Sequence, residues 1–124
     1  MSSVLDVDAE DWEKEVLQSS VLTIVDFWHE NCPWCIMLNP IFEEIAEEYR
    51  GRVKFVRFNV LKNRRNRDVA VRNGVMGTPT IAFYCNGRYL GSIVGFTSKN
   101  RLKHIIEDFI LRHRECVEQS TKFE

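Results

Sequence analysis

The sequence predicts an α/β domain of three layers, α/β/α, with a central mixed sheet between helices. Near-continuous apolar runs rich in β-branched residues recur along the chain, as in strands covered on both faces. Segments with apolar residues at helical spacing alternate with these runs. An Asn-Gly dipeptide between the last two runs indicates an antiparallel hairpin. The expected order is therefore β-α-β-α-β-α-β-β-α.

Local signals predict the first three elements. A short apolar stretch at 4–7 is expected to form a strand, and Asp8 is a candidate N-cap for a helix through residue 18. The side chains expected to turn inward from this helix are Trp12, Val16 and Leu17. Residues 21–28 (VLTIVDFW) are nearly all apolar, so we expect a strand in the middle of the sheet.

The middle of the chain shows clear periodicity. Residues 33–49 repeat apolar side chains at helical spacing, and Pro40 inside this helix predicts a kink. Residues 53–60 (VKFVRFNV) are expected to form a second central strand. Residues 64–73 predict a short helix that ends at Gly74.

The C-terminal part predicts a hairpin and a last helix. Strands at 80–84 and 89–94 flank Asn86-Gly87, a dipeptide that favours the type I′ turn. Thr97 or Ser98 can cap the helix that follows, whose apolar residues lie on one stripe.

Length and charge indicate one ordinary folded unit. The chain has 124 residues, and we expect a domain over 1–113 and a polar, frayed tail over 114–124. With 17 basic and 18 acidic side chains, nothing attracts the chain generally to nucleic acid or to a membrane. The first residues lack the features of a signal peptide, so we expect a cytoplasmic location. In that reducing compartment the four cysteines are not expected to form a disulfide framework.

Two cysteines, Cys32 and Cys35, lie in the stretch VDFWHENCPWC, where the expected central strand meets the next helix. Unpaired N–H groups and the helix dipole favour a thiolate at Cys32. Cys35 lies one turn further in, where it can attack a mixed disulfide formed at Cys32. A structural zinc site would need a second ligand pair, which neither the other cysteines nor the histidines supply at the usual spacing. An inert Cys-x-x-Cys is a further alternative, and we expect no metal.

Several stretches together closely resemble the thioredoxin family, in order and spacing, over about residues 4–112. The stretches that carry the resemblance are VDFWHENCPWC, Pro40, GVMGTPT, which ends in Thr78-Pro79-Thr80, the Asn86-Gly87 hairpin and Gly95. The resemblance implies the thioredoxin fold and a thiol-disulfide oxidoreductase that reduces protein disulfides without a cofactor.

The resemblance also implies roles for individual residues. Cys32 matches the nucleophile and Cys35 the resolving thiol. Asp26 matches a buried acid that accepts the proton of the resolving thiol through water, and burial in an apolar strand would raise its pKa for that task. An acid that caps a turn is the alternative for Asp26. Pro79 matches the family's cis-proline, whose loop offers backbone groups to an extended substrate, whereas the residues alone indicate a turn proline.

Surface and supporting residues follow from the same resemblance. Trp28 matches a tryptophan beneath the active site, although a core aromatic fits equally well. Trp34 is expected to project beside the nucleophile and to contact substrate, or else only to fill surface. Met76 and Thr78 are expected to line the same substrate-binding surface.

Two departures from the family pattern affect the redox chemistry. Pro33-Trp34 stands where classical thioredoxins have Gly-Pro. This dipeptide is closer to the Cys-Pro-aromatic-Cys of glutaredoxins and of some archaeal and bacterial thioredoxin-like proteins, which leaves the redox potential open. Arg57 stands where the family often has a lysine, and its permanent charge would favour the ionised form of Asp26.

Other reactive or charged residues carry weaker signals. The basic run KNRRNR (62–67) has no interleaved aromatics, so a solvated loop and helix start is expected rather than a nucleic-acid site. His29 is either a tuning residue for Cys32 or a surface histidine. Cys85 is expected to be a buried small hydrophobe, and Cys116 a tail residue that is either inert or an exposed thiol.

The favoured function is reduction of disulfides in protein substrates, with electrons from a donor such as thioredoxin reductase or glutathione. Nucleic acid and membrane are not expected partners. One alternative is a glutaredoxin-like or more oxidising exchange through the same cysteines. The other is a binding module that docks partners through Trp34, Met76 and Thr78 without essential redox turnover.

Overall fold

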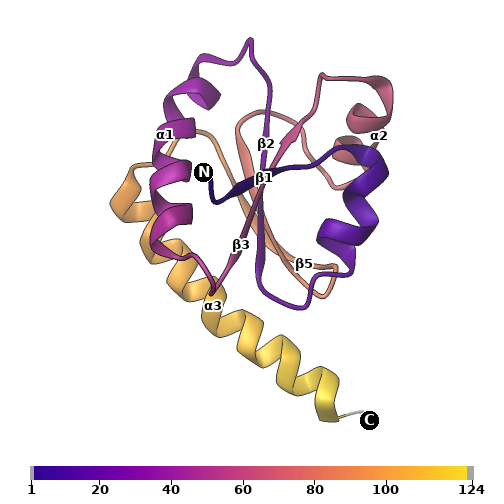
Figure 1. Cartoon of the computed structure of the whole chain (residues 1–124), viewed down its shortest axis with the longest axis vertical. Helices are drawn as coiled ribbons and strands as arrows, with labels where there is room; N and C mark the ends of the chain where they lie inside the picture. Colours follow the sequence, from indigo (N-terminus) through magenta and orange to yellow (C-terminus); the bar gives the residue numbers. More distant parts are fainter. Residues whose placement is uncertain (1, 123–124) are drawn as a thin grey trace.

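The computed structural model describes residues 2–122 and has a five-stranded sheet between helices (Figure 1). The strands are β1 (Val4–Asp6), β2 (Thr23–Trp28), β3 (Lys54–Asn59), β4 (Thr80–Cys85) and β5 (Arg88–Val94). Their order across the sheet is β1-β3-β2-β4-β5. β1, β3 and β2 are parallel, whereas β4 is antiparallel to β2 and to β5. The mixed sheet predicted from the sequence is confirmed.

Helices cover both faces of the sheet, which gives the three predicted layers (Figure 1). The helical elements are η1 (Ala9–Asp11), η2 (Glu13–Leu17), α1 (Pro33–Glu48), α2 (Arg64–Arg72) and α3 (Lys99–Lys122). One apolar core joins α1 and α3 to the sheet through residues such as Ile24, Phe55 and Phe83. A second core joins η1, η2 and α2 to the opposite face, which presents Val25, Phe27 and Tyr84.

The first helical segment differs from the regular helix expected over residues 8–18. It is a 3₁₀ turn followed by a π-helical turn, in which the Gln18 N–H donates to the Glu13 carbonyl at 2.9 Å. The wider turn keeps Trp12 and Val16 on the buried face and leaves Leu17 38% exposed. The inward orientation predicted for Leu17 was therefore wrong.

The last helix is longer than the sequence indicated. α3 continues to Lys122, so the described part of the tail expected from residue 114 is helical, while residues 123–124 lie outside the described part. Cys116 is buried and forms a disulfide with Cys85. The expectations of an inert or exposed Cys116 and of a chain without further disulfides were therefore wrong. Cys85 is buried as predicted, but as a bonded sulfur.

Within residues 2–122, no helix combines the length and the apolar character needed to cross a bilayer.

Candidate active site

Cys32 and Cys35 lie at the junction between the loop after β2 and the start of α1, where the sequence placed them. Cys32 is the N-cap of α1 and has an extended backbone, and Pro33 occupies the first helical position, which suits its fixed φ. The two cysteines form a disulfide, and their Cα atoms are 5.2 Å apart. Cys32 is 7% exposed and Cys35 is fully buried. An incoming group therefore reaches Cys32 first.

The start of α1 is electrostatically suited to a sulfur anion at Cys32. The Cys35 N–H donates to the Cys32 Sγ, with 3.2 Å between nitrogen and sulfur. No acid lies in the first turn of α1, so nothing on that turn offsets the partial positive charge of the helix N-terminus. A thiolate at this position is favoured by both the hydrogen bond and the dipole.

Asp26 lies within β2 and is fully buried. It alternates along the strand with Val25 and Phe27, so it faces the layer of α1 and α3. Among the described residues, neither of its carboxylate oxygens has a hydrogen-bond partner. Burial raises the pKa of Asp26 from 3.8 to about 7, and the positive charge of Arg57 opposes this rise. The carboxyl can therefore exchange a proton near neutral pH.

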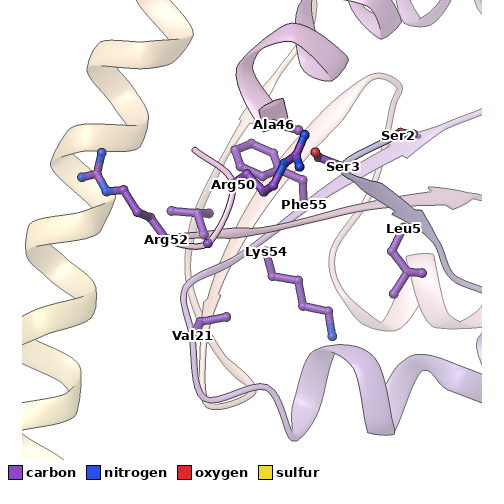
Figure 2. A pocket seen from close by; sticks show the side chains of 11 residues that line it. Ser2, Ser3, Leu5, Val21, Ala46, Arg50, Arg52, Lys54 and Phe55 are labelled. Atoms are coloured by element: carbon purple, nitrogen blue, oxygen red, sulfur yellow. The ribbon is translucent and has the colours of Figure 1, made fainter. Parts of the chain in front are cut away.

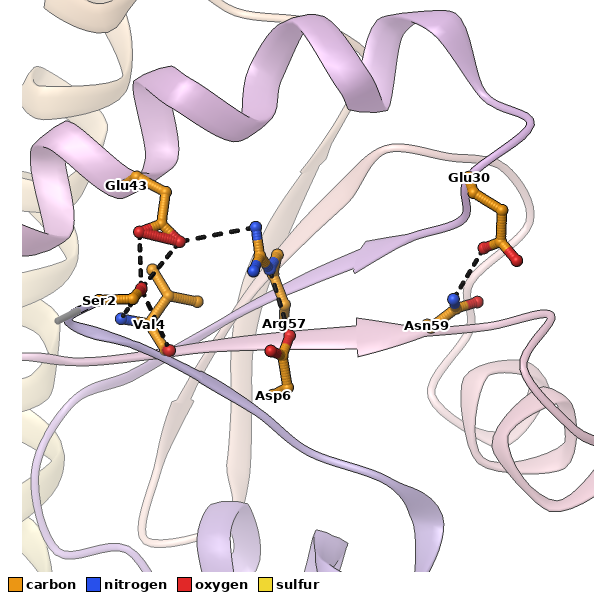
Figure 3. A network of polar contacts seen from close by, with 7 residues as sticks. All are labelled: Ser2, Val4, Asp6, Glu30, Glu43, Arg57 and Asn59. Atoms are coloured by element: carbon orange, nitrogen blue, oxygen red, sulfur yellow. Dashed lines mark hydrogen bonds and ion pairs between the residues drawn. The ribbon is translucent and has the colours of Figure 1, made fainter.

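Arg57 lies opposite Asp26 in the register of β2 and β3, but its guanidinium turns to other acids (Figure 3). It forms ion pairs with Asp6 at 3.3 Å and with Glu43 at 3.6 Å. The guanidinium also lies 5.7 Å from the centre of the Trp28 ring. Arg57 thus acts on Asp26 through its charge and not through a direct hydrogen bond.

The loop before β4 contains the cis peptide bond Thr78–Pro79, the isomer that the resemblance implied. The Pro79 carbonyl accepts from the Gly95 N–H at 2.8 Å, and the Thr80 hydroxyl donates to the Gly77 carbonyl at 2.6 Å. These bonds fix the loop on the C-terminal side of Met76, a residue that is 98% exposed. An almost fully exposed methionine beside a fixed loop is available for contact with a partner.

Trp34 projects from α1 beside Cys32, 56% exposed, and its ring centre lies 5.8 Å from that of Phe96. Phe96 follows β5 and is itself 37% exposed. Sequence reasoning missed Phe96, because a single aromatic residue in a loop has no periodicity. Its position directly after Gly95, at the end of the hairpin, was the available signal.

A surface hollow of about 300 Å³ is lined in part by the cis-proline loop. His29, Leu61, Met76 and Thr78 are among its lining residues. A second hollow, of about 650 Å³, opens near Ser2, Arg50 and Phe55 (Figure 2). It lies at the C-terminal end of α1, whereas the cysteines lie at the N-terminal end, so it is separate from the dithiol site.

The remaining reactive residues are spread over the fold. The KNRRNR run begins α2, where the Asn63 side chain accepts from the Asn66 N–H at 2.8 Å, as in an ordinary helix cap. His29 uses its ring nitrogen Nδ1 to accept from the Asn31 N–H at 3.2 Å. Within the part of the chain that the structure describes, no three His, Cys, Asp or Glu side chains gather as metal ligands.

Comparisons with known proteins match this geometry to one family. The family model described as Thioredoxin matches residues 3–108. The chain is 34% identical to thioredoxin 1 of Nostoc over 107 residues, which is 86% of this chain and 97% of the relative. It is 34% identical to the thioredoxin of Haemophilus influenzae over 110 residues, 89% of this chain and 100% of the relative. A Rickettsia felis thioredoxin is 37% identical over 91 residues, 73% and 84% of the two chains. With the Cys32–Cys35 pair at the Cys-x-x-Cys position, the chain is a thiol-disulfide oxidoreductase that belongs to the thioredoxin family.

Proposed function

We propose that this oxidoreductase works as a reductant of disulfides in proteins, with Cys32 as nucleophile and Cys35 as resolving thiol. The observation that carries the assignment is the hydrogen bond from the Cys35 N–H to the Cys32 Sγ at the start of α1. It favours the anionic form of one sulfur, the more exposed one, and so distinguishes the two cysteines.

The exchange takes place in two balanced steps. The Cys32 thiolate attacks one sulfur of the substrate disulfide, forms a mixed disulfide and releases the other substrate sulfur as a thiolate. Cys35 loses its proton, and its thiolate attacks Cys32 Sγ. This step releases the second substrate thiolate and leaves Cys32 and Cys35 oxidised. Two electrons have then moved from the protein dithiol to the substrate, which takes up two protons as its thiolates are protonated.

Asp26 is proposed as the acceptor of the Cys35 proton, through water. Its pKa of about 7 suits a general base near neutral pH, and it faces the layer to which Cys35 belongs. Arg57 and Trp28 are proposed as supporting residues, because the Arg57 charge acts on Asp26 and its guanidinium lies over the Trp28 ring. Pro33 supports the site by starting α1.

Trp34, Met76, Thr78 and Pro79 are proposed to contact the substrate. Trp34 and Met76 are exposed, and Thr78 lies between Met76 and Pro79 on the fixed loop. A substrate in extended conformation would lie against this loop while its disulfide meets Cys32. Such a surface fits protein disulfides better than small ones.

The electron donor is proposed to be thioredoxin reductase or glutathione, and the chain would then take part in electron transport and in thiol homeostasis. A cytoplasmic location stays a prediction from the sequence. The Pro33-Trp34 dipeptide favours one alternative, a more oxidising, glutaredoxin-like exchange. The binding module without redox turnover is the other.

The reduction potential of the Cys32–Cys35 pair tests the direction of exchange. Reference values are roughly −270 mV for thioredoxins and roughly −200 to −230 mV for glutaredoxins, and a value near the first would support reduction. The pair should be followed by peptide mapping after alkylation, so that its signal is kept apart from that of the second disulfide, Cys85–Cys116. A value above about −200 mV would instead support the oxidising alternative.

Trapping tests the roles of the two cysteines. The variant Cys35→Ser should accumulate a mixed disulfide with insulin at Cys32, and the matched variant Cys32→Ser should not. Accumulation in both variants to the same level would contradict the assignment. A Cys32→Ser, Cys35→Ser double variant that kept its biological activity would favour the binding module.

A further inference from the structure

The second disulfide, Cys85–Cys116, lies far from the active site. Cys85 ends β4, whereas the other end of that strand, Thr80, pairs with Phe27 of β2 near the catalytic loop. Cys85 is five residue steps along the strand from Thr80, which is roughly 17 Å at ~3.3 Å per residue. The Cys85–Cys116 pair therefore cannot exchange directly with Cys32–Cys35 of the same molecule.

The pair joins two different parts of the chain. The family model ends at residue 108, and Cys116 lies beyond it in the continuation of α3. Figure 1 shows these last turns of α3, in yellow, running out past the sheet toward the C-terminus. The disulfide thus connects a strand inside the thioredoxin domain to a helical extension outside the matched region.

The anchoring of α3 changes along its length. Its first half packs through Leu102, Ile106 and Phe109, and the Phe109 ring stacks on Phe83 with 3.8 Å between centres. Beyond His113, which is half-buried, Cys116 is the one buried side chain among residues 114–119. Leu111 and Val117 are exposed. The bond to Cys85 is therefore a covalent anchor for a segment, residues 114–119, whose one buried side chain is Cys116 itself.

We propose that Cys85 and Cys116 are a second redox site, in which the disulfide holds the last turns of α3 on the sheet and reduction releases them. The two sulfurs are bonded and buried, at 0% and 6% exposure of their residues, so the closed state is well protected. Reduction removes the covalent anchor of residues 114–119, which are exposed apart from Cys116, and exposed helix ends open locally without unfolding the domain.

A low-molecular-weight disulfide, such as oxidised glutathione, is the oxidant in this scheme. The Cys116 thiolate attacks one of its sulfurs and expels a thiolate, since Cys116 is the more exposed of the two. The Cys85 thiolate then attacks Cys116 Sγ and expels the second small thiolate. Two electrons pass from the protein to the small disulfide, and the two cysteine protons end on the two small thiols.

Limited proteolysis tests the proposal, because Arg112 and Arg114 flank His113 just before the anchor. The experiment uses the full chain with Cys32→Ser and Cys35→Ser, so that only the second pair is redox-active. After oxidised glutathione the intact mass should fall by two hydrogens. Trypsin should then cut at Arg112 and Arg114 roughly tenfold more slowly than in the dithiothreitol-reduced protein, because cleavage follows the population of the opened segment.

Two controls separate release from general unfolding. When Cys116→Ser is added, trypsin should cut at Arg112 and Arg114 at the rate of the reduced protein, with or without oxidised glutathione. Cleavage within α2, at Arg64–Arg72, should be equal in the oxidised and the reduced protein. Amide exchange of residues 114–119 in the protein with an intact Cys32–Cys35 pair should accelerate when Cys85 and Cys116 are both serine. Failure to form the disulfide, or equal cleavage and exchange rates in both states, would overturn the proposal. The proposed reductase activity is unaffected by either outcome.

Discussion

Asp26 and Arg57 are neighbours in the register of β2 and β3, yet they share no hydrogen bond. The guanidinium is directed to Asp6 and Glu43, on the first strand and on α1. Asp26 is left in an apolar setting, where its pKa is about 7. The Arg57 charge is near enough to lower the pKa of Asp26 in part, but it is paired with Asp6 and Glu43. Because Arg57 forms no direct bond with Asp26, the Asp26 carboxyl can still titrate.

The first prediction concerns stability and pH. Asp26 binds its proton more tightly in the folded chain, at about 7, than in the unfolded chain, at 3.8, so the free energy of unfolding falls as pH rises across that interval. In Asp26→Asn this loss is absent. The stability of the variant relative to the wild type should therefore increase by about 2–4 kcal/mol between pH 4 and pH 8.

Denaturant unfolding of the oxidised proteins at several pH values measures this difference. The buried amide that replaces the Asp26 carboxyl lowers the stability of the variant by the same amount at every pH. This amount cancels when the stability difference between variant and wild type is compared at two pH values. Asp8→Asn is the matched control with the opposite sign, because hydrogen bonds from Lys62 and Asn66 lower the pKa of Asp8. That variant should lose stability relative to the wild type at neutral pH and recover it in acid. A pH-independent difference for Asp26→Asn would contradict the buried titration.

The second prediction concerns the charge opposite Asp26. In Arg57→Gln the pKa of Asp26 should rise further, because the only lowering influence on it is removed. The carboxyl carbon shift of Asp26, followed by NMR against pH, gives the midpoint directly. Arg52→Gln is the control, since Arg52 lies 5.2 Å from the Tyr49 ring centre and does not act on Asp26. An unchanged midpoint in Arg57→Gln would show that solvent or Asp6 and Glu43 already neutralise the guanidinium.

The third prediction concerns the aromatic pair beside the nucleophile. Trp34→Ala and Phe96→Ala should each lower kcat/KM for a protein disulfide by roughly 3- to 10-fold, because the rings present one apolar surface. The double variant should lose less than the product of the two, since each ring supports the other at 5.8 Å. Turnover of a small disulfide should hardly change.

The matched control for the aromatic pair is Leu111→Ala, an exposed apolar residue on α3. It should leave both activities as they are. Equal losses for protein and small disulfides in the aromatic variants would assign the pair to the chemistry of Cys32 and not to substrate contact.

The sequence predicted what depends on local pattern. Residues 22–27 are buried on both faces because an apolar core lies against each face of the sheet, as their near-continuous apolar character indicated. Cys32 and Cys35 were found because a strand followed by a helix fixes their place. The turn at Asn86-Gly87 was also predicted from the sequence. Asn86 has a φ of 50° and Gly87 a φ of 81°, the positive values that a type I′ turn requires.

Features that depend on tertiary docking were not predictable in the same way. The bond between Cys85 and Cys116 spans 31 positions and requires the extension of α3 to lie over the end of β4. The outward turn of Leu17 follows from a π-helical turn that no local propensity encodes. The contact of Phe96 with Trp34 brings together a loop and a helix that are distant in sequence.

The last prediction concerns Gly87 in the turn between β4 and β5. A Cβ atom added there would lie 2.7 Å from the Leu17 carbonyl oxygen, a backbone atom that cannot simply rotate away. Gly51 has nearly the same backbone, with a φ of 84° against 81°, but has nothing within 4 Å of such an atom. Both substitutions to alanine therefore meet the left-handed backbone, at roughly 1–2 kcal/mol, and only Gly87→Ala also meets a clash.

Denaturant unfolding should show Gly87→Ala to be less stable than Gly51→Ala, by roughly 1–3 kcal/mol. Because the clash acts on η2, the loss should be accompanied by faster amide exchange near Leu17. If the two variants were equally stable, the turn and η2 would separate easily, and the packing between them would contribute little to the fold. A larger loss in Gly51→Ala would contradict the argument outright, because that position has no neighbour to displace.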